Sequence, residues 1–190
     1  MGEGVGKGSA EGKPKEGEEM PAFTANFVVL PLHKVVHLQS SAEKMIKQKT
    51  MEENTMIEEL LNKLSALAGT DDFEYESEEI IEQLKDEGAG FEIVEKLFTI
   101  IENHPLDDFG MPGAMVHYIE SFYPDFLPLL IASVKRTPSM HTVWMLNRCI
   151  NGKFSREELL SALREVAEND NTDKAIRDSA KSFLDYQTEK

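Results

Sequence analysis

Cysteine is almost absent from this sequence, and long hydrophobic runs are missing altogether. Cys149 is the only cysteine among 190 residues, which excludes an internal disulfide and is typical of a reducing compartment. Pro31, His33 and Lys34 interrupt the apolar stretch 27–36, so no run approaches the roughly 20 apolar residues that cross a bilayer. The first 20 residues also lack the pattern of a signal peptide. We therefore expect a cytoplasmic protein with no membrane partner.

Motifs for catalysis and for cofactor binding are missing as well. The sequence has no GxGxxG between a strand and a helix, no GxxxxGK[ST] and no GxSxG. His33 and His37 have the spacing of a zinc-binding helix, but no glutamate stands beside the first histidine and no third ligand is near. We therefore predict no metal site, no cofactor and no enzymatic activity.

Four side chains are still candidates for catalysis. They are His117, Glu120, His141 and Cys149. A Cys–His dyad would need a thiolate at Cys149. However, Leu146 and Ile150 flank this cysteine on a predicted helix, and both are typical of a protein core. We interpret Cys149 as a buried and inert thiol, because free cysteine is among the most buried residue types.

Basic residues are scarce in one third of the chain. The formal net charge is −15, and residues 51–110 hold 3 Lys/Arg against 18 Asp/Glu, which is again −15. Such a region repels nucleic acid and attracts basic molecules. We therefore expect a basic protein partner and no nucleic acid, although an acidic surface also serves solubility alone.

Apolar residues recur every three or four positions from about residue 41 onward, which is the period of an amphipathic helix. Glycine, proline and asparagine breaks divide this region into about eight helices joined by short loops. The sequence thus predicts a single all-α domain over residues 41–190. Residues 1–20 alternate glycine with Lys and Glu and are predicted to be a disordered tail. Residues 21–40 form an apolar arm whose structure the pattern leaves open.

Local signals mark several ends of these predicted helices. Gly69 is a plausible C-terminal cap for the first helix. Residues 71–77 are expected to be an acidic loop, with the next helix starting near residue 77. Ser155 and Glu158 have the spacing of a capping box, and Asp173, or one of the two residues before it, is expected to cap the last helix.

Helical hairpins in succession favour a right-handed array of antiparallel pairs. The stretch 173–180 resembles the second helix of a HEAT repeat, with Asp173 and Arg177 near its start and small residues behind. A stack of this kind presents an extended face suited to binding another protein. No fixed repeat length is visible, so a consensus repeat array is not predicted.

The densest acidic segment is our candidate for partner binding. Aromatic residues among charges are common at interfaces, and such patches capture basic partners quickly. Phe73 and Tyr75 serve either the interface or the core, and the sequence leaves both readings open. The candidate residues are Asp71, Asp72, Phe73, Glu74, Tyr75, Glu76, Glu78, Glu79 and Glu82.

Residues 110–152 resemble a family of small helical immunity proteins found beside bacterial polymorphic toxins and contact-dependent inhibition systems. The most distinctive part is Thr142-Val143-Trp144-Met145-Leu146-Asn147-Arg148. The resemblance implies that the chain binds and neutralises a cognate toxin domain in the cytosol. It draws attention to His117, Trp144, Asn147 and Arg148 as residues of structural or binding importance.

The residues themselves allow a more structural interpretation of this segment. Trp144 is expected in the core, and Arg136 and Arg148 are expected to pair with acids or helix ends. His117 and Asn147 are expected to be buried polar groups that satisfy the loop 110–113. The alternative function is a HEAT-like scaffold or adaptor that binds another protein without catalysis.

Overall fold

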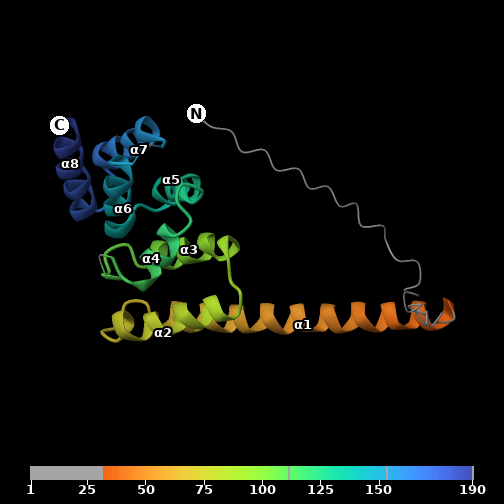
Figure 1. The fold of residues 1–190 in the computed structure, drawn as a ribbon. Coiled ribbons are helices and arrows are strands. Elements are labelled where there is room, and N and C mark those ends of the chain that lie inside the picture. Colours follow the sequence, from red (N-terminus) through yellow and green to blue (C-terminus); the bar gives the residue numbers. More distant parts are fainter. Residues whose placement is uncertain (1–31, 111, 153, 190) are drawn as a thin grey trace, which may run out of the picture. The chain divides into compact units, whose positions relative to one another are not determined.

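We analysed a computed structural model, which describes residues 32–110, 112–152 and 154–189, with side chains described from Glu43 onward. The chain divides into two compact units, Met1–Ala42 and Glu43–Lys190. The described residues form helices and no strand (Figure 1). The elements are α1 (Leu32–Leu67), α2 (Phe73–Asp86), the 3₁₀ turn η1 (Phe91–Ile93), α3 (Val94–Asn103), α4 (Ala114–Glu120), α5 (Leu127–Arg136), α6 (Met140–Ile150), α7 (Arg156–Glu168) and α8 (Lys174–Thr188). The prediction of an all-helical fold is confirmed.

Helix α1 crosses the boundary that we predicted at residue 40, because its backbone is already helical from Leu32. The predicted tail 1–20 and the first part of the predicted arm 21–40 lie outside the described residues. At its other end α1 stops as predicted. Gly69 has φ +79°, the left-handed conformation that a residue with a Cβ disfavours.

The expected acidic loop at residues 71–77 was wrong, since α2 begins at Phe73. The acids that suggested a loop occupy the first helical turn, where Glu74 and Glu76 lie. Negative charge is favourable there, because unpaired backbone N–H groups give the helix N-terminus a partial positive charge. The cluster of acidic residues is therefore compatible with the start of a helix at this position.

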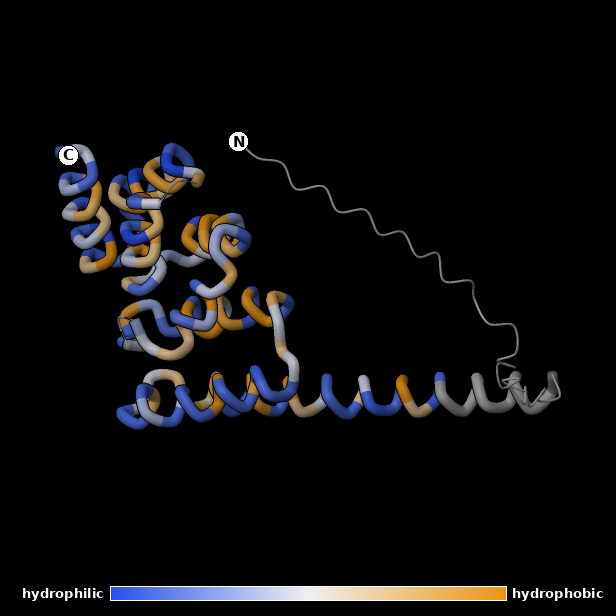
Figure 2. Tube along the Cα trace, viewed as in Figure 1, coloured by the Kyte–Doolittle hydropathy of each residue, from blue (hydrophilic) through white to orange (hydrophobic). Residues whose placement is uncertain are grey.

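The core of the second unit lies between the helices, where their hydrophobic positions meet (Figure 2). Each helix contributes residues at spacings of three and four, such as Ile80, Ile81 and Leu84 of α2. Phe73, Phe98, Phe109 and Phe126 are the largest fully buried side chains. Burying a side chain of this size stabilises a fold by about 1.5–3 kcal/mol. These aromatics therefore anchor the packing of α2, α3 and α5.

The helices pack both with their neighbours and with alternate helices along the chain. Helix α2 packs against α4, α3 against α5, α5 against α7, and α6 against α8. Consecutive pairs from α5 to α8 also pack together, so that α6, α7 and α8 form a three-helix group (Figure 1). Each helix from α3 to α8 thus packs against a helix one position away and a helix two positions away in the chain.

Ion pairs follow the same alternate spacing. Glu58 of α1 binds Lys96 of α3, and Lys135 of α5 lies 3.6 Å from Glu165 of α7. Glu102 of α3 binds Arg136 of α5 at 2.8 Å, and Glu120 of α4 binds Arg148 of α6 at 2.8 Å. The expected pairing of Arg136 and Arg148 with acids is confirmed. The two pairs with exposed acids, Glu58–Lys96 and Lys135–Glu165, add little stability, since surface ion pairs are worth little.

Helix starts in the C-terminal half agree with the predictions in one case and differ in another. Asp173 caps α8 by accepting a hydrogen bond from the Ala175 N–H at 2.7 Å, as expected. The capping box predicted at Ser155 was wrong: its φ is +52° and its side chain makes no capping hydrogen bond. Ser139 instead forms a reciprocal capping box with Thr142 at the start of α6.

One tyrosine joins the turn after α2 to α4. The hydroxyl of Tyr118 donates toward the carbonyls of Ala89 and Gly90, at 2.9 and 3.0 Å. Burial, and then the charge of Glu92, raises the pKa of this hydroxyl to about 12, so it keeps its proton.

The described helices include none that is long and apolar enough to cross a membrane.

Candidate functional site

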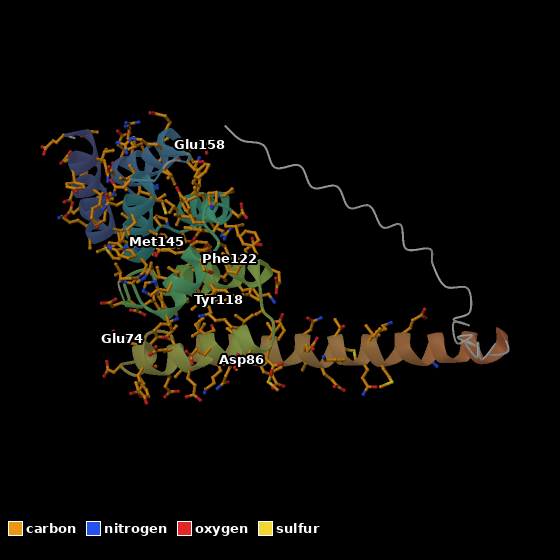
Figure 3. The ribbon with its side chains drawn as sticks, in the orientation of Figure 1. Glu74, Asp86, Tyr118, Phe122, Met145 and Glu158 are labelled. Atoms are coloured by element: carbon orange, nitrogen blue, oxygen red, sulfur yellow. The ribbon has the colours of Figure 1, made fainter. Side chains whose placement is uncertain are left out.

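Helix α2 has one buried side and one acidic side. Phe73, Ser77, Ile80, Ile81 and Leu84 are buried, and they recur with helical spacing. The opposite side carries exposed acids from one end of the helix to the other, with Glu74 and Asp86 at its two ends (Figure 3). We call this surface the α2 acidic face; it consists of Asp71, Asp72, Glu74, Tyr75, Glu78, Glu79, Glu82 and Asp86.

The two aromatic residues of the acidic segment have different roles. Phe73 is 2% exposed, and its ring meets that of Phe109 edge-on with centroids 4.9 Å apart. Tyr75 is 85% exposed and lies among the acids. The interface reading was therefore wrong for Phe73, which is a core anchor. Tyr75 is the aromatic side chain that a partner would meet on this face.

The carboxylates of the α2 acidic face have almost no compensating charge. Lys85 is the only basic residue of α2. Within the part of the chain that the structure describes, no carboxylate of this face takes part in an ion pair. Glu79 accepts one hydrogen bond from the amide of Gln83 at 3.1 Å. Glu76 is half-buried at the edge of the face. The uncompensated charge makes the local potential strongly negative.

The start of α2 borders a small polar hollow that extends the acidic surface. Its volume is about 260 Å³, and it lies between α2 and the loop after α3. Asp71 and Glu74 line it from one side, and Asp107 and Asp108 from the other. Asp107 also binds the ring of His104 at 2.8 Å. Among the described residues, no group of three or more His, Cys, Asp or Glu is arranged to hold a metal ion.

A second and larger hollow lies where the ends of α4 and α6 meet the loops that follow them. Its volume is about 630 Å³. Tyr123 and Phe154 form part of its wall with ring centroids 5.8 Å apart, and their side chains are 40% and 50% exposed. The other lining residues are Glu120, Phe126, Arg148, Cys149, Asn151 and Gly152. Its wall thus combines exposed aromatic rings with one ion pair, between Glu120 and Arg148.

Two side chains, those of Glu120 and Trp144, hold Arg148 at the edge of this hollow. Its Nε and Nη2 donate to the two carboxylate oxygens of Glu120, at 2.8 and 3.0 Å. Its guanidinium also lies 4.8 Å from the centroid of Trp144. The hydrogen bonds to Glu120 raise the pKa of Arg148. Trp144 is half-buried beneath this pair and does not lie fully in the core as we expected.

The chemistry of the larger hollow does not suit nucleophilic catalysis, although it holds two of the four catalytic candidates, Glu120 and Cys149. Burial, and then the charge of Glu120, raises the pKa of the Cys149 thiol to about 12, so the thiol is protonated at neutral pH. Both oxygens of Glu120 are taken by Arg148. Cys149 is buried, as predicted.

The two histidine candidates lie elsewhere and apart from Cys149. His141 is 1% exposed and packs against the rings of Phe109 and Trp144, with centroids 5.5 and 5.9 Å away. Neither of its ring nitrogens has a hydrogen bond of good geometry within the described residues. Burial lowers its pKa, against smaller opposing effects of Asp108 and the Gly110 backbone. His141 is therefore neutral at pH 7.

His117 and Asn147 do not satisfy the loop 110–113, and that expectation was wrong. The side chain of His117 is exposed on α4. Asn147 accepts a hydrogen bond from Gln187 of α8, with Oδ1 2.8 Å from Nε2. Gln187 is 3% exposed, and no local pattern predicts this contact because forty residues separate Gln187 from its partner. His117 thus lies on α4, and Trp144, Asn147 and Arg148 lie on α6.

Comparisons with models of protein families, with curated proteins and with solved structures found no match to this chain.

Proposed function

We propose that this chain is a non-catalytic binding protein that captures a basic protein partner on the α2 acidic face. The observation that carries the proposal is the row of exposed and unpaired carboxylates on one side of α2, with the exposed ring of Tyr75 among them. Charges that have no partner in the protein itself are available to an external cation. A tyrosine in their midst adds apolar contact area and one hydrogen bond at little entropic cost.

The physics of such a face favours rapid and specific capture. Its field extends about 8–10 Å into physiological salt. Complementary charge raises association rates far above those of neutral surfaces and excludes acidic competitors. The buried side of α2 holds the face in place through Phe73, Ile80 and Leu84. The surface is therefore rigid before the partner arrives, which lowers the entropic cost of binding.

The specific form of this function that we propose is neutralisation of a cognate toxin domain in the cytosol. The resemblance of residues 110–152 to immunity proteins supports it. A right-handed HEAT-like array is the architecture we propose for the helices, and the packing of alternate helices supports that arrangement. An acidic inhibitor suits a basic toxin, because many enzymes that act on nucleic acid are basic at their active sites.

The alternative is a helical scaffold or adaptor, and one observation favours it. The hollow beside Arg148 presents the half-exposed rings of Tyr123 and Phe154. These rings suit an apolar side chain of a protein partner. In this form the α2 acidic face serves solubility, and binding depends on shape.

The test is a calorimetric titration with the C-terminal domain of a large secreted protein encoded beside this chain. We expect tight binding that weakens about tenfold or more when Glu78, Glu79 and Glu82 are all changed to Gln, because three unpaired charges leave the interface. The matched control changes Glu157, Glu158 and Glu168 of α7 to Gln, which removes three exposed carboxylates elsewhere. The control should bind like the unaltered protein.

The possible outcomes distinguish the immunity form, the contact through α2 and the scaffold alternative. Absence of binding would reject the immunity form. Binding that the α2 triple variant and the α7 control weaken equally would reject the α2 acidic face as the contact. A Tyr123→Ala variant that loses binding, while the α2 variant keeps it, would favour the scaffold alternative.

A further inference from the structure

The hydrogen-bond acceptors around the larger hollow, beside Arg148, are already used by the chain itself. Both carboxylate oxygens of Glu120 accept hydrogen bonds from Arg148, at 2.8 and 3.0 Å. The carbonyl of Cys149 accepts from the backbone N–H of Gly152 at 2.8 Å. The side-chain oxygen of Asn151 accepts a hydrogen bond from α8 at 3.3 Å. The hollow therefore has little to offer to the donor of an occupant.

The polar groups that stay unused at this hollow can donate hydrogen bonds. Glu120 takes the Nε and one side of Nη2 of Arg148, so the N–H groups on the other edge of the guanidinium have no partner among the described residues. The ring of Trp144, 4.8 Å away, holds the guanidinium in place. The hydroxyl of Tyr123 also lines the hollow and makes no hydrogen bond within the described part of the chain. A complementary occupant brings an acceptor.

The rest of the wall is aromatic and uncharged. The ring centroid of Tyr123 lies 5.8 Å from that of Phe154 and 6.3 Å from that of Phe126. Phe126 is fully buried, whereas the other two rings are half-exposed at the opening. The volume of about 630 Å³ lies in the range of about 300–1,000 Å³ that is usual for ligand pockets. These rings favour an apolar group as the occupant.

We propose that this hollow binds a peptide segment of a partner protein, with one apolar side chain among the rings and one backbone carbonyl at the unused N–H groups of Arg148. A peptide carries these two groups side by side along its chain. Its carbonyl is a neutral acceptor, which suits an arginine whose charge Glu120 already balances. A carboxylate fits less well, because Glu120 places a negative charge beside it. The proposal develops the scaffold alternative and does not rest on the α2 acidic face.

A titration of the full chain with N-acetyl-phenylalanine amide, followed by protein NMR, tests the proposal. We expect saturable shifts of the Gly152 amide and the Arg148 Nε–H signals over about 0.1–20 mM, the affinity range of a small fragment. N-acetyl-glycine amide, which has no apolar side chain, should bind about tenfold or more weakly. Ionised N-acetyl-phenylalanine should bind about threefold or more weakly. The absence of saturable shifts, or equal binding of the amide and the carboxylate, would overturn the proposal.

A pair of matched arginine variants tests the donor role. Arg148→Lys keeps a positive charge beside Glu120 but removes the planar N–H groups on its other edge, so the amide probe should bind about threefold or more weakly. The control is Arg136→Lys, because Arg136 pairs with Glu102 through the same two nitrogens, both at 2.8 Å, and does not line the hollow. The control should bind like the unaltered protein. Equal affinities of the two variants would overturn the role of Arg148.

A second pair of variants tests the aromatic wall. Phe154→Ala should weaken binding of the probe about threefold or more, because it removes one of the rings that the side chain contacts. Phe91→Ala is the control, since its ring is 39% exposed at another place and packs against Phe122. The variant with Glu78, Glu79 and Glu82 changed to Gln should bind the probe like the unaltered protein. A loss of binding in that variant would place the probe on α2 and overturn the proposal.

Discussion

Arg148 contacts an acid on another helix and an aromatic ring on its own helix. Glu120 occupies its guanidinium on one side and Trp144 lies beneath it. Single residues in this chain therefore acquire their roles from helices far away in sequence. Two of our expectations for the neighbouring polar residues failed for this reason, since His117 is exposed and Asn147 binds Gln187.

The two aromatics at the start of α2 give the first prediction at this scale. Phe73→Ala should lower the free energy of unfolding by about 3–5 kcal/mol, because it leaves a cavity beside Phe109. Tyr75→Ala should change it by no more than about 0.5 kcal/mol, since the ring is exposed. Urea denaturation measures both values. A large loss of stability for Tyr75→Ala would contradict its place on the surface.

His141 gives a prediction about pH. Burial lowers its pKa in the folded protein below the usual value of about 6.5, so the unfolded chain binds the proton more readily. Stability should therefore be complete above about pH 7 and should fall as the pH is lowered toward about 5. In His141→Leu the slope over this range should be smaller, because the group that takes up the proton on unfolding has been removed.

The control for this pH effect is His117→Gln, which removes an exposed histidine. Chemical denaturation at several pH values gives the slopes of all three proteins. The effects of the other histidines cancel in the comparison between variants. Equal slopes for the unaltered protein and His141→Leu would show that His141 takes up its proton equally in both states, against its burial beside Phe109 and Trp144.

Side-chain roles that depend on one chain segment were predictable from sequence. The burial of Cys149 followed from the leucine and isoleucine that flank it in α6. Whether Phe73 or Tyr75 entered the core was open, because it depends on where Phe109 lies after folding. The partners of Arg136 and Arg148 were expected only to be acids or helix ends, since Glu102 and Glu120 are about thirty residues away.

At the scale of elements, the helix ends show which local signals dominate. Gly69 and Asp173 ended and started helices as expected, since each acts through the backbone next to it. The start of α2 was misplaced because exposed acids were taken as a sign of a loop. Ser155 has a suitable side chain, but its left-handed backbone precludes the usual capping geometry.

Two glycines with the same backbone conformation give a prediction at this scale. Gly69 and Gly88 both have φ +79°. An added Cβ at Gly88 meets nothing within 4 Å, whereas at Gly69 it would lie 2.7 Å from Asp107 Oδ2 and 3.1 Å from His104 Nδ1. Gly88→Ala should cost about 1–2 kcal/mol for conformation alone. Gly69→Ala should cost about 1 kcal/mol more, because it also displaces the His104–Asp107 pair.

Thermal or urea unfolding of the two variants provides the comparison. The two variants share the cost of a left-handed alanine. The difference between their losses of unfolding free energy therefore measures the contact of the added Cβ with the His104–Asp107 pair. Equal losses would mean that the His104–Asp107 pair moves aside freely, and the end of α1 would then be held by Gly69 alone.

At the scale of the whole molecule, the charge of the chain is concentrated where the structure leaves it unpaired. Ion pairs join α1 to α3, α3 to α5, α4 to α6 and α5 to α7. None of the carboxylates that define the α2 acidic face takes part in these ion pairs. The sequence predicted the excess of acid and its region, and the described fold separates the acids that support packing from those that face solvent.

The central claim is that the α2 acidic face captures a basic protein, and the association rate constant as a function of salt tests it most directly. Stopped-flow mixing with a candidate basic partner, the C-terminal domain of a large secreted protein encoded upstream, should give a rate that falls steeply from low to physiological salt. The variant with Glu78, Glu79 and Glu82 changed to Gln should associate more slowly and show a shallower dependence on salt. An identical salt dependence for the variant and the unaltered protein would contradict the claim.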